Sequence, residues 1–124
     1  MIRDRYFSCS EINSLYNKST NHEDIWTHIT KIGTVEKIEP EYFLEKYKTR
    51  CCQAQLRDNT GVVNLTLWEE DIDRVQNGYK IKIENGLIKE ISGKKRFSTG
   101  FLGRLTILEI PKKSPSVLAP VRSY

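Results

Sequence analysis

The residues best suited to chemistry are concentrated in one stretch, Cys51 to Glu70, which reads CCQAQLRDNTGVVNLTLWEE. Its polar and large side chains fall at alternate positions: Gln53, Gln55, Arg57, Asn64, Thr66 and Trp68. Amides and hydroxyls hydrogen-bond to bases or sugars, a guanidinium binds phosphate, and an indole stacks on a base. These residue types in this order therefore suit a surface that contacts a nucleic acid.

A β-hairpin would place these six side chains on one face. The positions between them are apolar: Cys52, Ala54, Leu56, Val63, Leu65 and Leu67. Successive side chains of a strand point to opposite faces, and Asp58 to Gly61 has the composition of a turn. If Arg57 faces Val62, the apolar residues pair on one face, and a slip of one residue would scramble both faces. The pattern therefore predicts the hairpin and its register.

A second group of candidate residues lies in residues 40–49, PEYFLEKYKT, just before the hairpin. This segment follows a strand-breaking Glu-Pro step and is expected to form a loop or a short lid. It brings Tyr47 and Lys48 close to Arg50, and aromatics interleaved with cations suit a nucleic-acid contact. The alternative is an amphipathic turn that buries Phe43 and the leucine after it.

A third group of candidates is a run of cations beyond the hairpin. Residues 93–96 are expected to form a turn that carries Lys94, Lys95 and Arg96, with Lys89 shortly before it. Cations grouped in this way would meet phosphates. The alternative is an ordinary solvated turn.

Three longer stretches predict the remaining strands. Residues 25–38 alternate apolar and polar side chains and lose phase near Gly33, which indicates a bulge or a bend. Residues 79–92 contain an Asn-Gly step at Asn85 that is either a hairpin turn or a kink within one long strand. Residues 97–110, interrupted by two glycines, form the last strand.

Two short helical segments complete the predicted elements. Residues 10–16 can form one or two helical turns with Ser8 or Ser10 as the cap, and residues 69–75 begin with acids, which favour a helix N-terminus. Five strands with glycine-marked bends and a short helix between the third and fourth predict an all-β fold with small helical elements. We expect a five-stranded OB-fold Greek-key barrel.

The chain is expected to divide into three parts. Residues 1–24 are polar and irregular and are expected to pack on the barrel, which spans residues 25–110. Residues 111–124 contain three prolines and read as an extended tail that does not fold alone.

Composition limits the functions that remain. The net charge is +4, from 20 Lys plus Arg against 16 Asp plus Glu, which permits a polyanionic partner without demanding one. The chain has no apolar run long enough to span a membrane and no apolar signal-peptide core at its start, so we expect an intracellular protein without a membrane partner. The three cysteines suit a reducing compartment.

Catalysis and bound cofactors are not expected. The sequence has no phosphate loop, nucleophile elbow, metal cluster or convincing pair of acids. Cys51 and Cys52 are neighbours on a predicted strand and point to opposite faces, so they do not form a ligand pair. We therefore predict no enzyme, no metal site and no cofactor.

Three motifs occur in order along this chain: Asp58-x-Thr60-Gly61-x-Val63-x-Leu65-x-Leu67-Trp68, then Gly78-x-x-Ile81-x-Ile83-x-Asn85-Gly86, then Gly93 and Gly100. They resemble the single OB domain of archaeal and eukaryotic single-stranded DNA-binding proteins, which are related to replication protein A. The resemblance covers roughly residues 25–110. It implies a role in DNA replication, repair or telomere maintenance, in the nucleus of a eukaryote or the cytoplasm of an archaeon.

The resemblance implies a stacking role for Trp68, whose alternative is a rim residue that covers the barrel mouth. Family members place further aromatics where this chain has Leu87, Ile91 and Ser98, with Phe97 one place off and on the other face. Most of the stacking platform is therefore absent. Stacking contributes about 1–3 kcal/mol per base, so the missing rings bear directly on affinity.

Two functions follow from these residues. The first is binding of single-stranded DNA, with RNA as an alternative ligand, by Trp68, Arg57, Gln53, Gln55, Asn64, Thr66, Lys48, Arg50, Tyr47, Lys89, Lys94, Lys95, Arg96 and Phe97. The second is a structural OB subunit of a larger nucleic-acid-binding complex. Its contacts with protein partners would come from Leu87, Ile91, Phe101, Val117, Leu118 and Val121.

Overall fold

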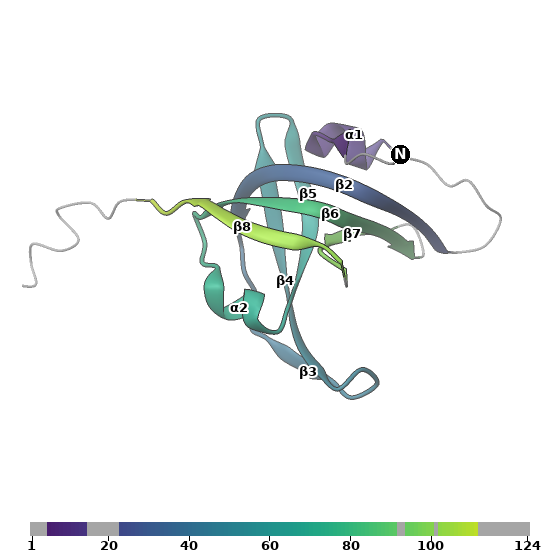
Figure 1. The fold of residues 1–124 in the computed structure, drawn as a ribbon, viewed down its shortest axis with the longest axis vertical. Helices are drawn as coiled ribbons and strands as arrows, with labels where there is room; N and C mark the ends of the chain where they lie inside the picture. Colours follow the sequence, from purple (N-terminus) through teal and green to yellow (C-terminus); the bar gives the residue numbers. More distant parts are fainter. Residues whose placement is uncertain (1–4, 15–22, 92–93, 101, 112–124) are drawn as a thin grey trace, which may run out of the picture.

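The structure, a computed structural model, describes residues 5–14, 23–91, 94–100 and 102–111. Strands dominate it (Figure 1): β1 (Arg5–Tyr6), β2 (Glu23–Glu36), β3 (Tyr42–Leu44), β4 (Thr49–Asp58), β5 (Gly61–Trp68), β6 (Lys80–Ile91), β7 (Lys94–Ser98) and β8 (Arg104–Glu109). Two single-turn helices accompany them: α1 (Cys9–Asn13) and α2 (Glu70–Arg74).

Five of the strands close into a barrel. The order is β2, β4, β5, β7 and β6, and β6 pairs again with β2 to complete the ring. All these pairings are antiparallel except β5 with β7, which is parallel. This arrangement is the OB fold that the sequence predicts. The extra strands extend it: β1 pairs with β2, β3 with β4 and β8 with β6.

The register of the β4–β5 hairpin matches its prediction. Arg57 pairs with Val62 and Leu56 with Val63, and the pairing continues without a slip to Cys51 and Trp68. The apolar set of both strands faces the interior, where most of its side chains are at most 4% exposed. The opposite, outward face carries the polar set, because paired residues of neighbouring strands share a face.

The barrel interior is filled mainly by branched aliphatic side chains and one aromatic ring, that of Phe97. The buried set includes Ile29, Val35, Cys52, Leu56, Leu65, Ile81, Ile83, Ile88 and Phe97. Phe97 is 1% exposed and pairs with Ile88. A side chain at Gly86 would place its Cβ 2.7 Å from the Phe97 ring, so the glycine leaves the space that this ring occupies.

The structure decides the two predicted bends, at Gly33 and at the Asn-Gly step, in different ways. The register of β2 against β6 shifts between Trp26 and Lys31, a few residues before the predicted bulge at Gly33. Gly33 is instead a point of close approach, because a Cβ there would lie 2.8 Å from Cγ of Leu56. Asn85 has a φ of 53° inside the continuous strand β6, so the Asn-Gly step is the kink and not the hairpin turn.

Residues 40–49 are not simply the predicted loop or short lid, because three of them form a strand and residues 45–48 turn back toward β4. Strand β3 pairs with the start of β4, with Tyr42 opposite Cys51 and Leu44 opposite Thr49. We call this hairpin, residues 42–51, the arm; it projects away from the barrel in Figure 1. Phe43 is 52% exposed, so the alternative of a turn that buries this ring does not hold.

The predicted turn of three cations is also a strand. Lys94, Lys95 and Arg96 are the first residues of β7, where they pair with the end of β6. The predicted last strand is therefore two strands, β7 and β8, with residues 99–103 between them. Helix α2 lies where the sequence predicts it.

Helix α1 joins the turn of the β4–β5 hairpin. Ser8 caps it, and Ser8 and Glu11 form a reciprocal capping box. Its two buried residues, Cys9 and Ile12, belong to the main core cluster. Ser10 donates its amide to the Thr60 hydroxyl of the turn, at 3.0 Å. The C-terminal part of the predicted helical segment, with Leu15 and Tyr16, lies outside the described residues.

Asp58 connects the turn, the helix and the barrel. One carboxylate oxygen accepts hydrogen bonds from the Lys31 ammonium at 2.5 Å and the Cys9 amide at 2.9 Å. The other accepts from the Thr60 amide at 2.7 Å and its hydroxyl at 2.6 Å. Burial alone would raise the pKa of Asp58, but the Lys31 and Thr60 hydrogen bonds and the Cys9 amide lower this pKa well below its usual range.

In the part of the chain that the structure describes, no helix is long and apolar enough to cross a membrane. The predicted tail after Pro111 lies outside that part.

We expect Asp58→Asn to destabilise the protein by about 3 kcal/mol, because Lys31 is only 2% exposed and loses its counter-charge. The measurement is urea unfolding at neutral pH. Asp73→Asn is the matched control: Asp73 is 63% exposed, and its partner Arg50 keeps two other carboxylates. Equal effects of the two substitutions would contradict a buried charge pair at Asp58.

The stabilising effect of Asp58 is expected to depend on pH with a defined sign. Its pKa is lower in the folded state than the ordinary 3.8, so the folded protein binds fewer protons and stability rises with pH. The difference in unfolding free energy between the natural chain and Asp58→Asn should be constant near neutral pH and shrink as the pH falls below about 4. Unfolding curves at several pH values test this, and a difference that grows toward acid would contradict it.

Candidate nucleic-acid interface

The outward face of β4, β5 and β7 carries the predicted polar residues in rows. Gln53 pairs with Thr66, and Gln55 pairs with Asn64, which in turn pairs with Arg96 of β7. We call this surface the groove face. Its rows arise because paired residues share a face, so the hairpin register alone aligns side chains that are far apart in sequence.

Gln53 is the centre of a hydrogen-bond network on the groove face. Its side-chain oxygen accepts from the Arg96 guanidinium at 2.5 Å and from the Thr66 hydroxyl at 3.1 Å. Its side-chain nitrogen donates to the Tyr42 hydroxyl at 2.8 Å. Four strands are thereby connected by one amide, and Thr66, only 7% exposed, is held beneath the surface.

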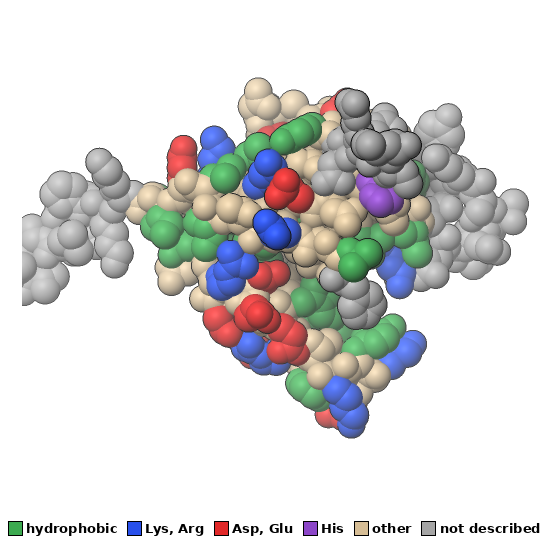
Figure 2. Space-filling model, viewed as in Figure 1, with side chains coloured by type: hydrophobic (Ala, Val, Ile, Leu, Met, Phe, Trp, Pro, Cys, Tyr) green, Lys and Arg blue, Asp and Glu red, His purple; other side chains and the backbone are tan. Residues whose placement is uncertain are grey.

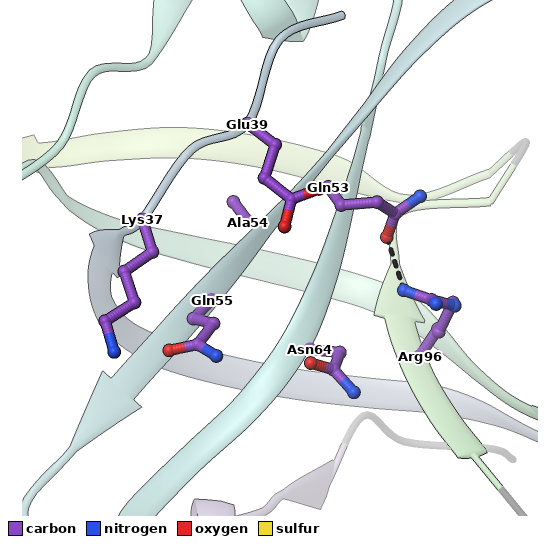
Figure 3. A pocket seen from close by; sticks show the side chains of 7 residues that line it. All are labelled: Lys37, Glu39, Gln53, Ala54, Gln55, Asn64 and Arg96. Atoms are coloured by element: carbon purple, nitrogen blue, oxygen red, sulfur yellow. Dashed lines mark hydrogen bonds between the residues drawn. The ribbon is translucent and has the colours of Figure 1, made fainter. Parts of the chain in front are cut away.

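A shallow pocket lies beside this network (Figure 3). Its lining comes from β4, β5, β7 and the segment after β2: Lys37, Glu39, Gln53, Ala54, Gln55, Asn64 and Arg96. Lys37 and Glu39 reach in from one side and Arg96 from the other, with the amides of Gln55 and Asn64 between them. The pocket is almost wholly polar and offers donors and acceptors to a ligand.

Two aromatic residues stand at one end of the groove face. Tyr42 and Trp68 both pair with Cys51, from opposite sides, so the three residues form one row across β3, β4 and β5. Strands two apart in a sheet are about 10 Å apart. Cys51 between them is 1% exposed, Tyr42 is 43% exposed and Trp68 is half-buried. The hydrogen bond with Cys51 raises the pKa of Tyr42.

Trp68 also borders a second open depression. It lies between α2 and the connection from β7 to β8, and its lining includes Asp71, Arg74, Thr99 and Arg104. Burial raises the pKa of Asp71, although Arg74 pairs with it at 3.0 Å. The alternative for Trp68, a rim residue that covers the barrel mouth, stays a prediction.

Arg50 is committed to carboxylates and not to the groove face. It forms ion pairs with Asp73 of α2 at 2.9 Å, Glu41 at 3.4 Å and Glu69 at 3.7 Å. Glu69 accepts hydrogen bonds from the Thr49 hydroxyl and, at 2.8 Å, from the Arg50 amide. The Asp73 hydrogen bond raises the pKa of Arg50 above its ordinary value. Arg50 therefore anchors the arm to α2.

Acidic side chains gather over α2, between the barrel and the arm, whereas basic and hydrophobic side chains mark the arm itself (Figure 2). At the tip of the arm, Tyr47 is 58% exposed and Lys46 lies 5.4 Å from the centre of its ring. Lys48 is 79% exposed and pairs loosely with Glu45 at 3.8 Å. The two predicted contacts Tyr47 and Lys48 are thus accessible, but they lie on the arm and not among the rows of the groove face.

The remaining predicted contacts divide between the two faces of the sheet. Lys89 pairs with Arg96, so it shares the outward face, and Lys94 is exposed at the start of β7. Lys95 pairs with Glu90 on the inward side, and their charges lie 3.5 Å apart. Phe97 fills the core, as its predicted orientation requires, so its ring is not available to a ligand. We leave Lys95 and Phe97 out of the candidate interface.

Arg57 closes the other end of the groove face. Its guanidinium donates two hydrogen bonds to the Glu36 carboxylate, both at 3.0 Å, and its side chain is 51% exposed. The hydrogen bond from Arg57 lowers the pKa of Glu36. Part of the positive charge predicted for phosphate contact is thus already compensated.

The residues predicted for a protein contact are only partly described. Leu87 is half-buried, pairs with Ser98 on the outward face and lies beside Gly100. The side chain of Ile91 and the residues Phe101, Val117, Leu118 and Val121 lie outside the described part of the chain.

Three residues of the site are not among the contacts predicted from sequence: Lys37, Glu39 and Tyr42. Tyr42, an aromatic of residues 40–49, is one of the residues that could replace the missing stacking rings, but it is not among the predicted contacts, because three residues of strand leave little alternation to detect. Lys37 has a φ of 55°, and the segment that follows β2 turns back over β4. The Glu-Pro step was the one signal for a change of direction there.

Within residues 5–14, 23–91, 94–100 and 102–111, no group of three or more His, Cys, Asp or Glu side chains is placed to hold a metal ion. Cys51 and Cys52 point to opposite faces: Cys52 belongs to the core cluster, and Cys51 pairs with Trp68.

Residues 19–107 match a protein family described as "Single-stranded DNA binding protein Ssb-like, OB fold". The match spans most of the chain, and the chain belongs to this family. The resemblance noted from the three sequence motifs is thereby confirmed.

Similar solved structures are archaeal OB domains. The second OB-fold domain of replication protein A from Methanococcus maripaludis is 21% identical with a TM-score of 0.58, over 88% of this chain and 100% of that one. A replication factor A related protein from Methanobacterium thermoautotrophicum is 19% identical, with a TM-score of 0.56, over 85% and 92%. An OB domain from Thermoplasma acidophilum is 19% identical with a TM-score of 0.55, over 70% and 82%. At these identities the likeness establishes the fold. No curated protein matches the chain.

We expect Arg50→Ala to loosen the arm without unfolding the barrel, because three carboxylates lose the cation that ties the arm to α2. Hydrogen exchange should become several-fold faster at the backbone amides of β3 and the start of β4, and stay unchanged in β6. Arg57→Ala removes another ion-paired arginine at the far end of β4, 51% exposed against 33% for Arg50, and serves as the control. Unchanged exchange in the arm of Arg50→Ala would contradict an anchoring role.

Proposed function

We propose that this domain binds single-stranded DNA across the groove face. The observation that carries the proposal is the single row of Tyr42, Cys51 and Trp68 beside the amide network of Gln53. Membership of the Ssb-like OB family, whose fold is a nucleic-acid-binding and non-enzymatic one, supports it.

Stacking would come from Trp68 and Tyr42. The sequence pattern leaves Trp68 without aromatic companions on β6 and β7, and Tyr42 supplies a second ring, 43% exposed, from the arm. Its hydroxyl is held by Gln53, so the ring is oriented before a ligand arrives. A preordered side chain loses less conformational entropy on binding.

Phosphates would meet cations around the rim of the groove face. Lys37 and Arg96 border the pocket, Lys89 and Lys94 lie on β6 and β7, and Lys48 lies on the arm. Single-stranded nucleic acids follow such basic borders while their bases stack on aromatic rings. We place this activity in DNA replication, repair or telomere maintenance, with RNA as the alternative ligand.

A second candidate function is a structural subunit of a larger nucleic-acid-binding complex. Exposed aliphatic side chains around β8 favour it: Leu102 is 83% exposed, Ile110 60% and Leu108 43%. Such side chains near one edge of the sheet suit a protein contact. In this case the groove face would bind a DNA strand weakly or not at all.

Titration of a labelled oligo(dT) with the protein tests the proposed function. We expect micromolar or tighter binding that weakens as salt rises, and a loss of roughly tenfold to a hundredfold in Trp68→Ala. In Trp26→Phe, Trp68 is the one remaining tryptophan of the two in the sequence, and its fluorescence should be quenched on binding.

Trp26→Phe is also the matched control, because Trp26 packs against the core and not on the groove face. Its affinity should equal that of the natural chain. Absence of binding at low salt by a folded protein would overturn the proposal in favour of the structural subunit. An undiminished affinity in Trp68→Ala would remove the stacking account.

A further inference from the structure

The pocket on the groove face contains a carboxylate that phosphate binding does not require. Glu39 lies over β4 among the cations and amides of the pocket, and Figure 3 shows it beside Gln53 and opposite Arg96. Among the described residues, no hydrogen bond or ion pair engages its side chain. An anion at this place repels phosphate and binds groups that donate hydrogen bonds.

The position of Glu39 is fixed by its own backbone. Its amide donates to the Gln53 carbonyl at 2.9 Å, and the preceding amide, of Ile38, donates to the Asn77 side chain at 3.0 Å. Ile38 packs against the core, and the residues on either side of it, Lys37 and Glu39, both line the pocket. Pro40 follows directly and restricts the backbone of Glu39 to extended conformations.

A base edge is the ligand part that fits this lining. Unstacked bases of a single strand present their Watson–Crick edges to proteins. A carboxylate accepts two parallel hydrogen bonds where two donors lie side by side. Among the four bases only guanine has this pair, at N1 and N2. Thymine has one donor between two acceptors, and adenine and cytosine have one amino group beside an acceptor.

The rest of the pocket completes the fit to guanine. Guanine O6 and N7 are acceptors that lysine and arginine recognise, and Lys37 and Arg96 stand on either side of the pocket. The Gln55 and Asn64 amides lie between them and can meet the sugar or the ring edge.

We propose that the pocket binds one guanine of the DNA strand, with Glu39 accepting from N1 and N2 and a flanking cation donating to O6. This inference rests on the proposed function, since the strand must lie on the groove face for a base to enter. It adds a sequence preference to a surface that stacking alone would leave tolerant of any base.

The first test uses the natural chain and five labelled oligonucleotides: all-thymine, and the same length with one central guanine, inosine, adenine or cytosine. Inosine retains N1 and O6 but lacks the N2 amino group. We expect the guanine oligonucleotide to bind about tenfold more tightly than all-thymine, with inosine between them. Equal binding of guanine and thymine, or tighter binding of adenine or cytosine than of guanine, would overturn the inference.

The second test is Glu39→Gln, which keeps the size of the side chain and removes its charge. We expect the guanine preference to vanish and the affinity for all-thymine to stay the same or rise, because an anion has left the groove face. Glu109→Gln makes the same charge change on an exposed residue of β8 and should keep the preference. A preference that survives in Glu39→Gln would overturn the role of Glu39.

The two proposals fail in distinguishable ways. If the natural chain binds all five oligonucleotides equally, the guanine site is wrong and strand binding stands. If it binds none of them at low salt, strand binding and the guanine site both fall.

Discussion

The pairing register of β4 and β5 is the constraint on which the rest of the structure depends. It directs one set of side chains into the barrel and the other onto the groove face. Because β7 pairs with β5, the side chains of β7 are divided between the same two faces. Asp58 holds the register at its closed end, where one carboxylate bonds the turn, helix α1 and the buried ammonium of Lys31. The barrel core and the candidate interface therefore both result from the same pairing register.

The groove face is organised before any ligand is present. Gln53 bonds to Tyr42, Thr66 and Arg96, so residues from four strands are held in one arrangement. The cations on and around this face differ in their pairing. Arg57 and Arg50 are paired with carboxylates, whereas Lys37 and Lys94 are not engaged by any described residue in a hydrogen bond or ion pair. The number of Lys and Arg residues in the sequence therefore overstates the positive charge that is available to bind phosphate.

Most of the fold follows from the sequence because alternation is strong where strands are long. The β4–β5 register comes from alternation along both strands and from the turn residues between them, and helix α2 comes from the acids at its start. The sequence left the Asn-Gly step open between a hairpin turn and a kink, and the continuous strand β6 decides for the kink. The arm was missed because β3 is three residues long, and β7 because a run of cations resembles a turn until its pairing with β6 is known. Within the site, the alternating polar residues were found, and Glu39 and Lys37 were not. Their position depends on the segment after β2 folding back over β4. This tertiary contact leaves no periodic pattern in the local sequence.

The anchoring of the arm by Arg50 has a consequence for how binding would respond to salt. The dependence of affinity on salt is commonly converted into a number of phosphate contacts through the counterions that are released. In this protein the arm that presents Tyr42 is itself held by exposed ion pairs to Glu41, Glu69 and Asp73, which salt also screens. A salt titration would therefore report loss of arm orientation together with loss of phosphate contacts. The number of contacts read from its slope would exceed the number that the strand makes.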